Sequence, residues 1–170
     1  MFFRKKNTSP EARLKEAEDC YKKGEASIKL HDFAKAEKSF LKCVSILEPL
    51  SEQHDARTLQ RKLSQAYSML SVLGLAVTDE KKRKEAIEWA KKAVEIDEEL
   101  VAQAGTPDAY DNLATSYSNL GAATLDIMLC DKALQIWMNL QKQYPENPLY
   151  AKRVETQQYN NRQLLLKAFS

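Results

Sequence analysis

The sequence predicts an all-α domain, and three observations support this. Among its 170 residues are only four glycines and five prolines, which leaves few residues for the turns of a β fold. Alanine, leucine, glutamate and lysine, which are good helix formers, are abundant. A small residue followed at a distance by an alanine recurs three times, which indicates an internal repeat. We therefore expect about seven helices, arranged as antiparallel pairs plus a final helix.

Capping residues and apolar periodicity place these helices. Ser9, Pro10 and Glu11 suit the N-cap, the first helical position and an acid that favours the helix dipole. Thr106, Pro107 and Asp108 repeat the same arrangement. The predicted helices cover about 10–30, 33–48, 52–77, 79–103, 107–127, 129–143 and 147–168.

The first pair is predicted from Gly24 and Ala36, which stand at positions i and i+12. Phe40 and Cys43 follow the alanine at +4 and +7, a spacing that forms one face of a helix. The two helices are expected to meet where the small residues lie.

The second pair is predicted from Ser71 and Ala86, which stand at positions i and i+15. Ala90 and Ala93 follow at +4 and +7. An apolar stripe extends the first helix of this pair upstream, and it consists of Leu59, Leu63, Tyr67, Leu70 and Leu73.

The third pair is predicted from Gly121 and Ala133, again at positions i and i+12, with Trp137 and Leu140 at +4 and +7 of the alanine. A glycine inside a helix costs about 1 kcal/mol relative to alanine. We expect Gly121 to be tolerated because the backbone of a neighbouring helix approaches there, with Ala133 as the facing small residue. Trp89 and Trp137 are expected to be packing residues. The first helix of this pair also has an apolar stripe, which consists of Tyr110, Leu113, Tyr117 and Leu120.

The final helix, about 147–168, follows Pro145 and has a largely polar middle, KRVETQQYNNRQ. It is expected to cap the repeats, with one face in water. The segment LLLKAF at 164–169 places three leucines in a row, which cannot all face one side of a helix. Core packing and contact with a second molecule both remain open for this segment.

The pattern resembles the tetratricopeptide repeat, a helix-turn-helix unit that stacks into a right-handed solenoid. The resemblance implies three repeats at about 10–50, 52–103 and 107–145, a flexible tail at 1–9 and a capping helix at 146–170. The central alanines, Ala36, Ala86 and Ala133, are spaced more widely than the roughly 34 residues that are usual in this family. The helices are therefore expected to be long, and the HEAT and armadillo solenoids remain alternatives.

The resemblance also implies a binding site. Members of this family bind a peptide or helix of a partner protein in a concave groove lined by the first helix of each pair. The candidate groove residues are Glu18, Tyr21, Glu25, Ile28 and Lys29 from the first unit, Gln65, Ser68, Val72 and Leu75 from the second, and Thr115, Ser118, Ala122 and Leu125 from the third.

Relatives that bind chaperone tails clamp a carboxylate with Lys, Arg and Asn side chains. The matching positions here are Tyr21, Glu25, Met69, Thr115 and Asn119, and four of them lack the required donor. A chaperone co-factor role is therefore not expected.

Charge argues against nucleic-acid binding. The chain carries 26 basic and 24 acidic residues, so no long basic face is expected for nucleic acid. The run KKRK at 81–84 lies among acids, with Glu80–Lys84 and Glu88–Lys92 at i,i+4 spacing, and is expected to be a solvated face.

A membrane role is not expected either. No apolar run approaches the roughly 18 residues of a membrane-spanning helix. The N-terminal segment MFFRKK is unlike a signal peptide, so a cytoplasmic location is expected. Its two phenylalanines are weak evidence for membrane contact.

No catalytic, metal or cofactor site is expected. Cys20, Cys43 and Cys130 are widely spaced and are expected to be reduced and buried. His31 and His54 are isolated from other metal ligands in the sequence.

The leading hypothesis is a non-catalytic adaptor that accepts an uncharged or weakly polar peptide or helix from another protein. A homodimer or other homo-oligomer built on the apolar C-terminal helix is the alternative. A peptide-sensing regulator is a third hypothesis, although no output domain is visible in the 170 residues.

Overall fold

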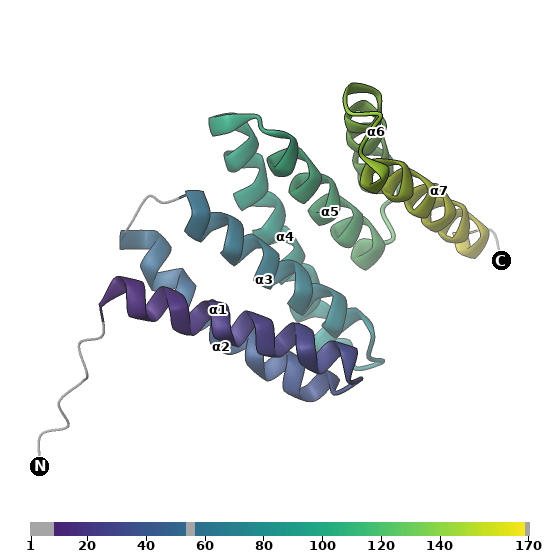
Figure 1. Ribbon diagram of the computed structural model, residues 1–170. Helices are drawn as coiled ribbons and strands as arrows, with labels where there is room; N and C mark the ends of the chain where they lie inside the picture. Colours follow the sequence, from purple (N-terminus) through teal and green to yellow (C-terminus); the bar gives the residue numbers. More distant parts are fainter. Residues whose placement is uncertain (1–8, 54–56, 169–170) are drawn as a thin grey trace, which may run out of the picture. The chain divides into compact units, whose positions relative to one another are not determined.

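The computed structural model describes residues 9–53 and 57–168, and within these ranges the chain forms seven helices joined by short connections (Figure 1). This confirms the all-α class. The helices are α1 Pro10–Lys29, α2 Phe33–Gln53, α3 Arg57–Leu75, α4 Glu80–Ala104, α5 Pro107–Thr124, α6 Ile127–Gln143 and α7 Pro148–Ala168. The predictions for MFFRKK and for His54 lie outside the described residues, as does the flexible tail predicted at 1–9 except for Ser9.

Both predicted N-caps are confirmed. The Ser9 hydroxyl accepts a hydrogen bond from the backbone N–H of Ala12 at 3.3 Å, and the Thr106 hydroxyl accepts one from Ala109 at the same distance. Three aspartates that were not predicted as caps serve the same purpose at α2, α4 and α6. They are Asp32, Asp79 and Asp126, whose carboxylates accept hydrogen bonds from the backbone N–H groups of Lys35, Lys82 and Met128 respectively.

Helix α2 runs past its predicted end at 48, through Pro49 to Gln53. A proline inside a helix removes one backbone hydrogen bond and costs about 3 kcal/mol. Leu47 and Leu50, on either side of Pro49, are buried at 0% and 2% exposure. Continuing the helix keeps both leucines on its apolar face, which offsets the cost of the proline.

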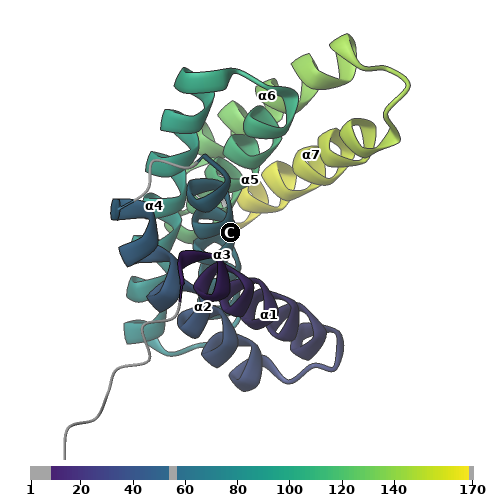
Figure 2. The same cartoon turned by 60° about the vertical axis from the view of Figure 1, so that its left-hand side comes forward.

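The contacts divide the chain into one unit up to Ala66 and another from Tyr67, so that α3 contributes to both. In the first unit, α1 and α2 pack side by side in antiparallel directions (Figures 1 and 2). A Cβ atom added to Gly24 would lie 2.6 to 2.8 Å from three atoms of the Phe40 ring. The absence of a side chain at Gly24 therefore lets the buried Phe40 ring fill the space between the two helices.

In the unit that begins at Tyr67, the pairs α3–α4 and α5–α6 also each meet at a glycine. A Cβ on Gly121 would lie 2.6 Å from Sγ of Cys130 and 2.9 Å from the backbone oxygen of Asp126, where α6 begins. The predicted close approach at Gly121 is thus confirmed, but its nearest neighbour is Cys130 and not Ala133. A Cβ on Gly74, in α3, would lie 2.8 Å from Cβ of Ala86 in α4.

Gly74 therefore corrects the repeat register of the second pair. Gly74 and Ala86 stand at positions i and i+12, the same spacing as in the other two pairs. Ser71, one helical turn earlier, was expected to be the small residue at this contact. Ser71 is buried at 0% exposure, but the close helix contact lies at Gly74.

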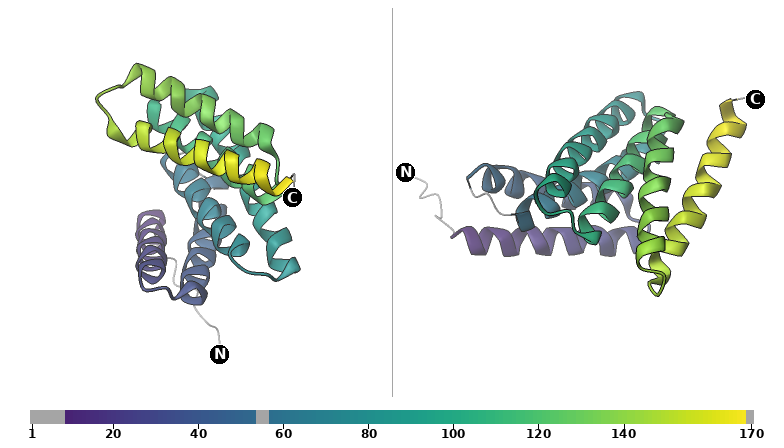
Figure 3. Two further views of the ribbon diagram at one scale, coloured as in Figure 1. Left: turned by 90° about the vertical axis from the view of Figure 1, so that its right-hand side faces the viewer. Right: turned by 90° about the horizontal axis from the view of Figure 1, so that it is seen from above.

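Helix α7 lies antiparallel to α6 and packs against it (Figure 3). Tyr150 and Val154 of α7 join a buried cluster with Trp137 and Leu140 of α6. The opposite face is exposed, as expected for a capping helix, and includes Tyr159 at 64%. Leu165 and Leu166 are also exposed, so at least two of the C-terminal leucines do not pack into the core.

Other sequence predictions are also confirmed. All three cysteines are free and buried. In the run 81–84, Lys84 pairs with Glu80 at 3.7 Å and Lys81 pairs with Glu85 at 3.9 Å, as expected for a solvated face. Trp137 is buried, and Trp89 is half-buried. Glu88 pairs with Lys91 at 2.8 Å, and the ammonium group of Lys92 lies over the ring of Tyr67.

Candidate functional site

The predicted groove residues of the first unit line a hollow of about 360 Å³, which we call the α1–α3 hollow. Glu18, Tyr21 and Glu25 of α1 and Gln65 of α3 all belong to it. Ile28 and Lys29 are not among its lining residues. The complete lining is Ala17, Glu18, Tyr21, Lys22, Glu25, Cys43, Leu47, Lys62 and Gln65.

Charges in the α1–α3 hollow are balanced. Lys62 forms an ion pair with Glu18 at 2.9 Å, and its hydrogen bond and charge lower the pKa of that carboxyl. Burial, and secondly the charge of Glu25, raise the pKa of Tyr21 to about 12. At neutral pH the Tyr21 hydroxyl is therefore uncharged, and it can donate or accept a hydrogen bond.

In the second pair the predicted groove residue Ser68 is a core residue, so the expectation that it faces an open groove is wrong. Ser68 is 8% exposed, and its hydroxyl lies 3.2 Å from that of Ser116 in α5. Ser116 in turn donates to the carboxylate of Asp97 in α4 at 2.6 Å. The physical reason is that this face of α3 points toward α5, where the Ser68 hydroxyl joins Ser116 and Asp97 in a buried polar cluster.

Four predicted groove residues of the second and third repeats line neither the α1–α3 hollow nor the second hollow, which is described next. Val72 and Leu125 are exposed at 46% and 65%, Ala122 is also exposed, and Leu75 is half-buried. None of the four is among the lining residues of either hollow.

Thr115 and Ser118 of the third unit line a second hollow, the α5–α7 hollow, of about 350 Å³. It lies between the first helix of the third pair and the capping helix. The complete lining is Thr115, Ser118, Asn119, Trp137, Leu149, Lys152, Arg153, Thr156, Gln157 and Asn160.

A chain of polar side chains fixes α7 at this hollow. Ser118 donates to Oε1 of Gln157 at 2.6 Å, and Nε2 of Gln157 donates to Asn161 at 2.7 Å. Asn161 then donates to the carboxylate of Asp131 in α6, also at 2.7 Å. Gln157 and Asn161 are 2% and 7% exposed, so these bonds satisfy polar groups that would be costly to bury alone.

Asp111 positions two lining residues of the α5–α7 hollow, Trp137 and Arg153. Its carboxylate accepts a hydrogen bond from Nε1 of Trp137 at 2.7 Å. It also accepts one from Arg153 of α7 at 3.5 Å, and the Arg153 guanidinium lies 5.7 Å from the centre of the Trp137 ring. The guanidinium is therefore held in place by both a carboxylate and an aromatic face.

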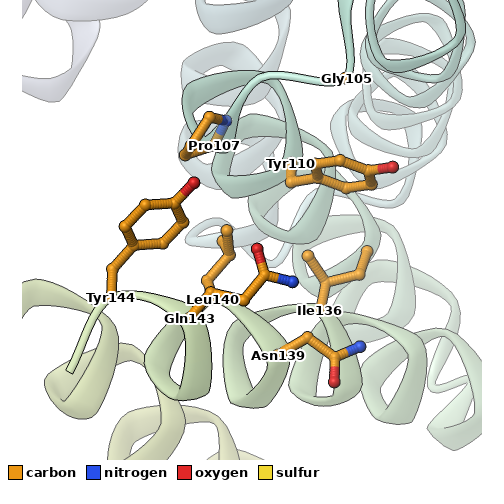
Figure 4. Close-up of a pocket in the computed structure, with 8 residues that line it drawn as sticks. All are labelled: Gly105, Pro107, Tyr110, Ile136, Asn139, Leu140, Gln143 and Tyr144. Carbon is orange, nitrogen blue, oxygen red and sulfur yellow. The ribbon is translucent and has the colours of Figure 1, made fainter.

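A third hollow, of about 230 Å³, was not predicted from the sequence (Figure 4). The rings of Tyr110 and Tyr144 lie on its two sides, near Pro107 at the start of α5 and Leu140 of α6. Tyr110 was expected only as a member of an apolar stripe. Its 38% exposure shows that one end of that stripe reaches the surface.

Neither a metal site nor a membrane-spanning helix is found in the described part of the chain. No group of three or more His, Cys, Asp or Glu residues there is arranged to hold a metal ion. None of the helices between residues 9 and 168 combines the length and the apolar character needed to cross a membrane.

The comparisons with known proteins agree with the helix-pair architecture. The family model described as tetratricopeptide repeat matches residues 13–46, which span most of α1 and of α2, and residues 67–100, which span about half of α3 and most of α4. No curated protein matches the chain.

Two solved structures show the same fold. One is the C-terminal TPR-containing domain of a Plasmodium falciparum protein described as FK506-binding, with a TM-score of 0.53 and 16% identity, covering 92% of this chain and 95% of that one. The other is a de novo designed helical repeat protein, with a TM-score of 0.50 and 13% identity, covering 94% of this chain and 97% of that one. The two matched segments identify tetratricopeptide repeats in the first two helix pairs, and the two solved structures show that the chain has the fold of a helical repeat protein.

Proposed function

We propose that the protein is a non-catalytic adaptor that binds a peptide or helix of another protein through hollows lined by the first helices of its repeats. Tetratricopeptide repeats generally mediate protein–protein interaction, which supports the adaptor role. The observation that carries the proposal is that six predicted groove residues line two such hollows. They are Glu18, Tyr21, Glu25 and Gln65 in the α1–α3 hollow, and Thr115 and Ser118 in the α5–α7 hollow.

The size and lining of these hollows suit peptide side chains. Each has a volume of about 350 to 360 Å³, at the lower end of the range of about 300 to 1,000 Å³ for small-molecule sites. Each is lined by a mixture of apolar, charged and amide side chains. Such a surface can hold one or two side chains of a segment whose remainder lies outside the hollow.

Site-specific photo-crosslinking tests the proposal. Benzoylphenylalanine would be placed at Glu25 or Asn119, in the two hollows, and at the exposed positions Lys38 and Gln135 of α2 and α6 as controls. We expect the same partner protein to be crosslinked from one or both hollow positions in a lysate of the native source, and much less from the controls. Equal or stronger crosslinking from the controls would contradict the proposal.

A homo-oligomer is the second candidate function, and the exposure of Leu165 and Leu166, at 46% and 59%, favours it. A second copy covering these leucines would remove apolar surface from water. Light scattering on the full chain and on a chain lacking residues 164–170 distinguishes the two candidates. A dimer that becomes a monomer on deletion supports the oligomer, and a full chain that is already monomeric refutes it.

We also propose that the protein is located in the reducing cytoplasm, because its three cysteines are free and buried. In that compartment they would act only as small apolar side chains.

A further inference from the structure

The α5–α7 hollow differs in charge from the α1–α3 hollow. Its described lining includes two cations, Lys152 and Arg153, and no carboxylate. The α1–α3 hollow, by contrast, has two lysines and two glutamates in its lining. A balancing charge beside the α5–α7 hollow is Asp111, whose carboxylate is already bonded to Trp137 and Arg153.

Several hydrogen-bond donors of this hollow are available to a ligand. The ammonium group of Lys152 and the side-chain amides of Asn119 and Asn160 have no hydrogen-bond partner among the described residues. The hydroxyls of Thr115 and Thr156, by contrast, donate to backbone carbonyls of their own helices. Two amides and one ammonium group, contributed by α5 and α7, can therefore donate into the same hollow.

Arg153 adds a cation that is fixed before any ligand binds. Its guanidinium carries five N–H donors, of which Asp111 takes only part. Because Asp111 and the Trp137 ring already hold it, little further side-chain entropy is lost when it binds a carboxylate.

We propose that the α5–α7 hollow binds an acidic segment of the partner protein, with Asp or Glu carboxylates facing Lys152 and Arg153. This inference rests on the proposed adaptor function and replaces the uncharged partner expected from the sequence. The excess of cations and the uncommitted donors both favour carboxylates over an apolar side chain. The volume of about 350 Å³ accommodates one or two such side chains.

Fluorescence anisotropy with two labelled peptides tests this proposal on the full chain. One peptide contains four consecutive glutamates between glycines, and the other has glutamine at the same four positions. We expect the glutamate peptide to bind about tenfold tighter at low salt, and the difference to shrink as salt is added.

Two matched variants locate the binding. Lys152→Gln removes a charge at the hollow, whereas Lys142→Gln removes one from the exposed end of α6, outside the hollow. We expect Lys152→Gln to weaken binding of the glutamate peptide by about three- to tenfold and Lys142→Gln to weaken it by less than about twofold. Circular dichroism would establish that both variants are folded.

Three results would overturn the proposal: equal binding of the two peptides, equal effects of the two variants, or equally tight competition by a single-stranded oligonucleotide. The last result would indicate a general affinity for polyanions. The adaptor function can be judged separately, because crosslinking of a partner from Asn119 would persist if only the acidic specificity were wrong.

Discussion

Gly121→Ala is predicted to destabilise the protein, although alanine is the better helix former. In an open helix face, this change would stabilise by about 1 kcal/mol. Here the new Cβ would lie 2.6 Å from Sγ of Cys130 and 2.9 Å from the backbone oxygen of Asp126. Overpacking of this kind costs about 1 to 3 kcal/mol, and the backbone at Asp126 cannot move without shifting the start of α6.

We expect a net loss of about 1 to 2 kcal/mol, or a fall in Tm of about 2 to 8 °C for a chain of this length. Gly121→Leu should cost several kcal/mol, since a larger side chain has no space to enter. Urea unfolding monitored by circular dichroism would give both values. Ala122→Gly, at the exposed neighbouring position, is the control and should cost only the helix propensity of about 1 kcal/mol.

A double-mutant cycle with Cys130→Ala tests the named contact. Removing Sγ relieves the closest approach, so the two changes together should cost about 1 kcal/mol less than their sum. If Gly121→Ala instead stabilises the protein, the face of α5 at this position is open and the close packing of α5 on α6 is wrong.

Three further predictions concern buried and paired groups. Burial raises the pKa of Cys43 to about 12, so Ellman's reagent at pH 8 should label this thiol slowly in the native protein and rapidly in urea. Lys62 lowers the pKa of Glu18 below its ordinary value of 4.5. The stability that this pair contributes is therefore present above pH 4.5 and is lost as the pH falls through the lowered pKa. Lys62→Met should raise the pKa of Glu18 in an NMR titration. Ser116→Ala removes a donor from the buried carboxylate of Asp97 and should cost about 1 to 3 kcal/mol in urea unfolding, whereas Thr156→Ala on the exposed side of α7 should cost much less.

Much of the fold could be predicted because local signals agree with tertiary packing. Ser9 and Thr106 mark helix starts by hydrogen bonds within one turn, which depend only on nearby residues. The apolar stripe of α3 is buried along its whole length, since helical spacing alone places its members on one face. The end of α2 could not be predicted in this way, because burial of Leu50 by tertiary contacts overrides the local effect of Pro49.

The site was predicted less completely, for two physical reasons. In the second pair, Ser71 resembles the small residue of the other pairs, and only the close approach of Ala86 identifies Gly74 instead. In the third repeat, Ser118 lines the α5–α7 hollow, but no local pattern indicated that Gln157 would accept a hydrogen bond from its hydroxyl. A helix that buries polar side chains has weak apolar periodicity, so its packed face is not apparent from the sequence.

The central claim is that the hollows on the first helices form the binding surface, and chemical-shift mapping by NMR tests it most directly. A peptide from the crosslinked partner would be added to the isotope-labelled full chain. We expect the largest shifts at lining residues of the α1–α3 hollow, the α5–α7 hollow or both, such as Glu25, Gln65, Asn119 and Lys152. Largest shifts on the exposed faces of α2 and α6, around Lys38 and Gln135, with little change in either hollow, would contradict it.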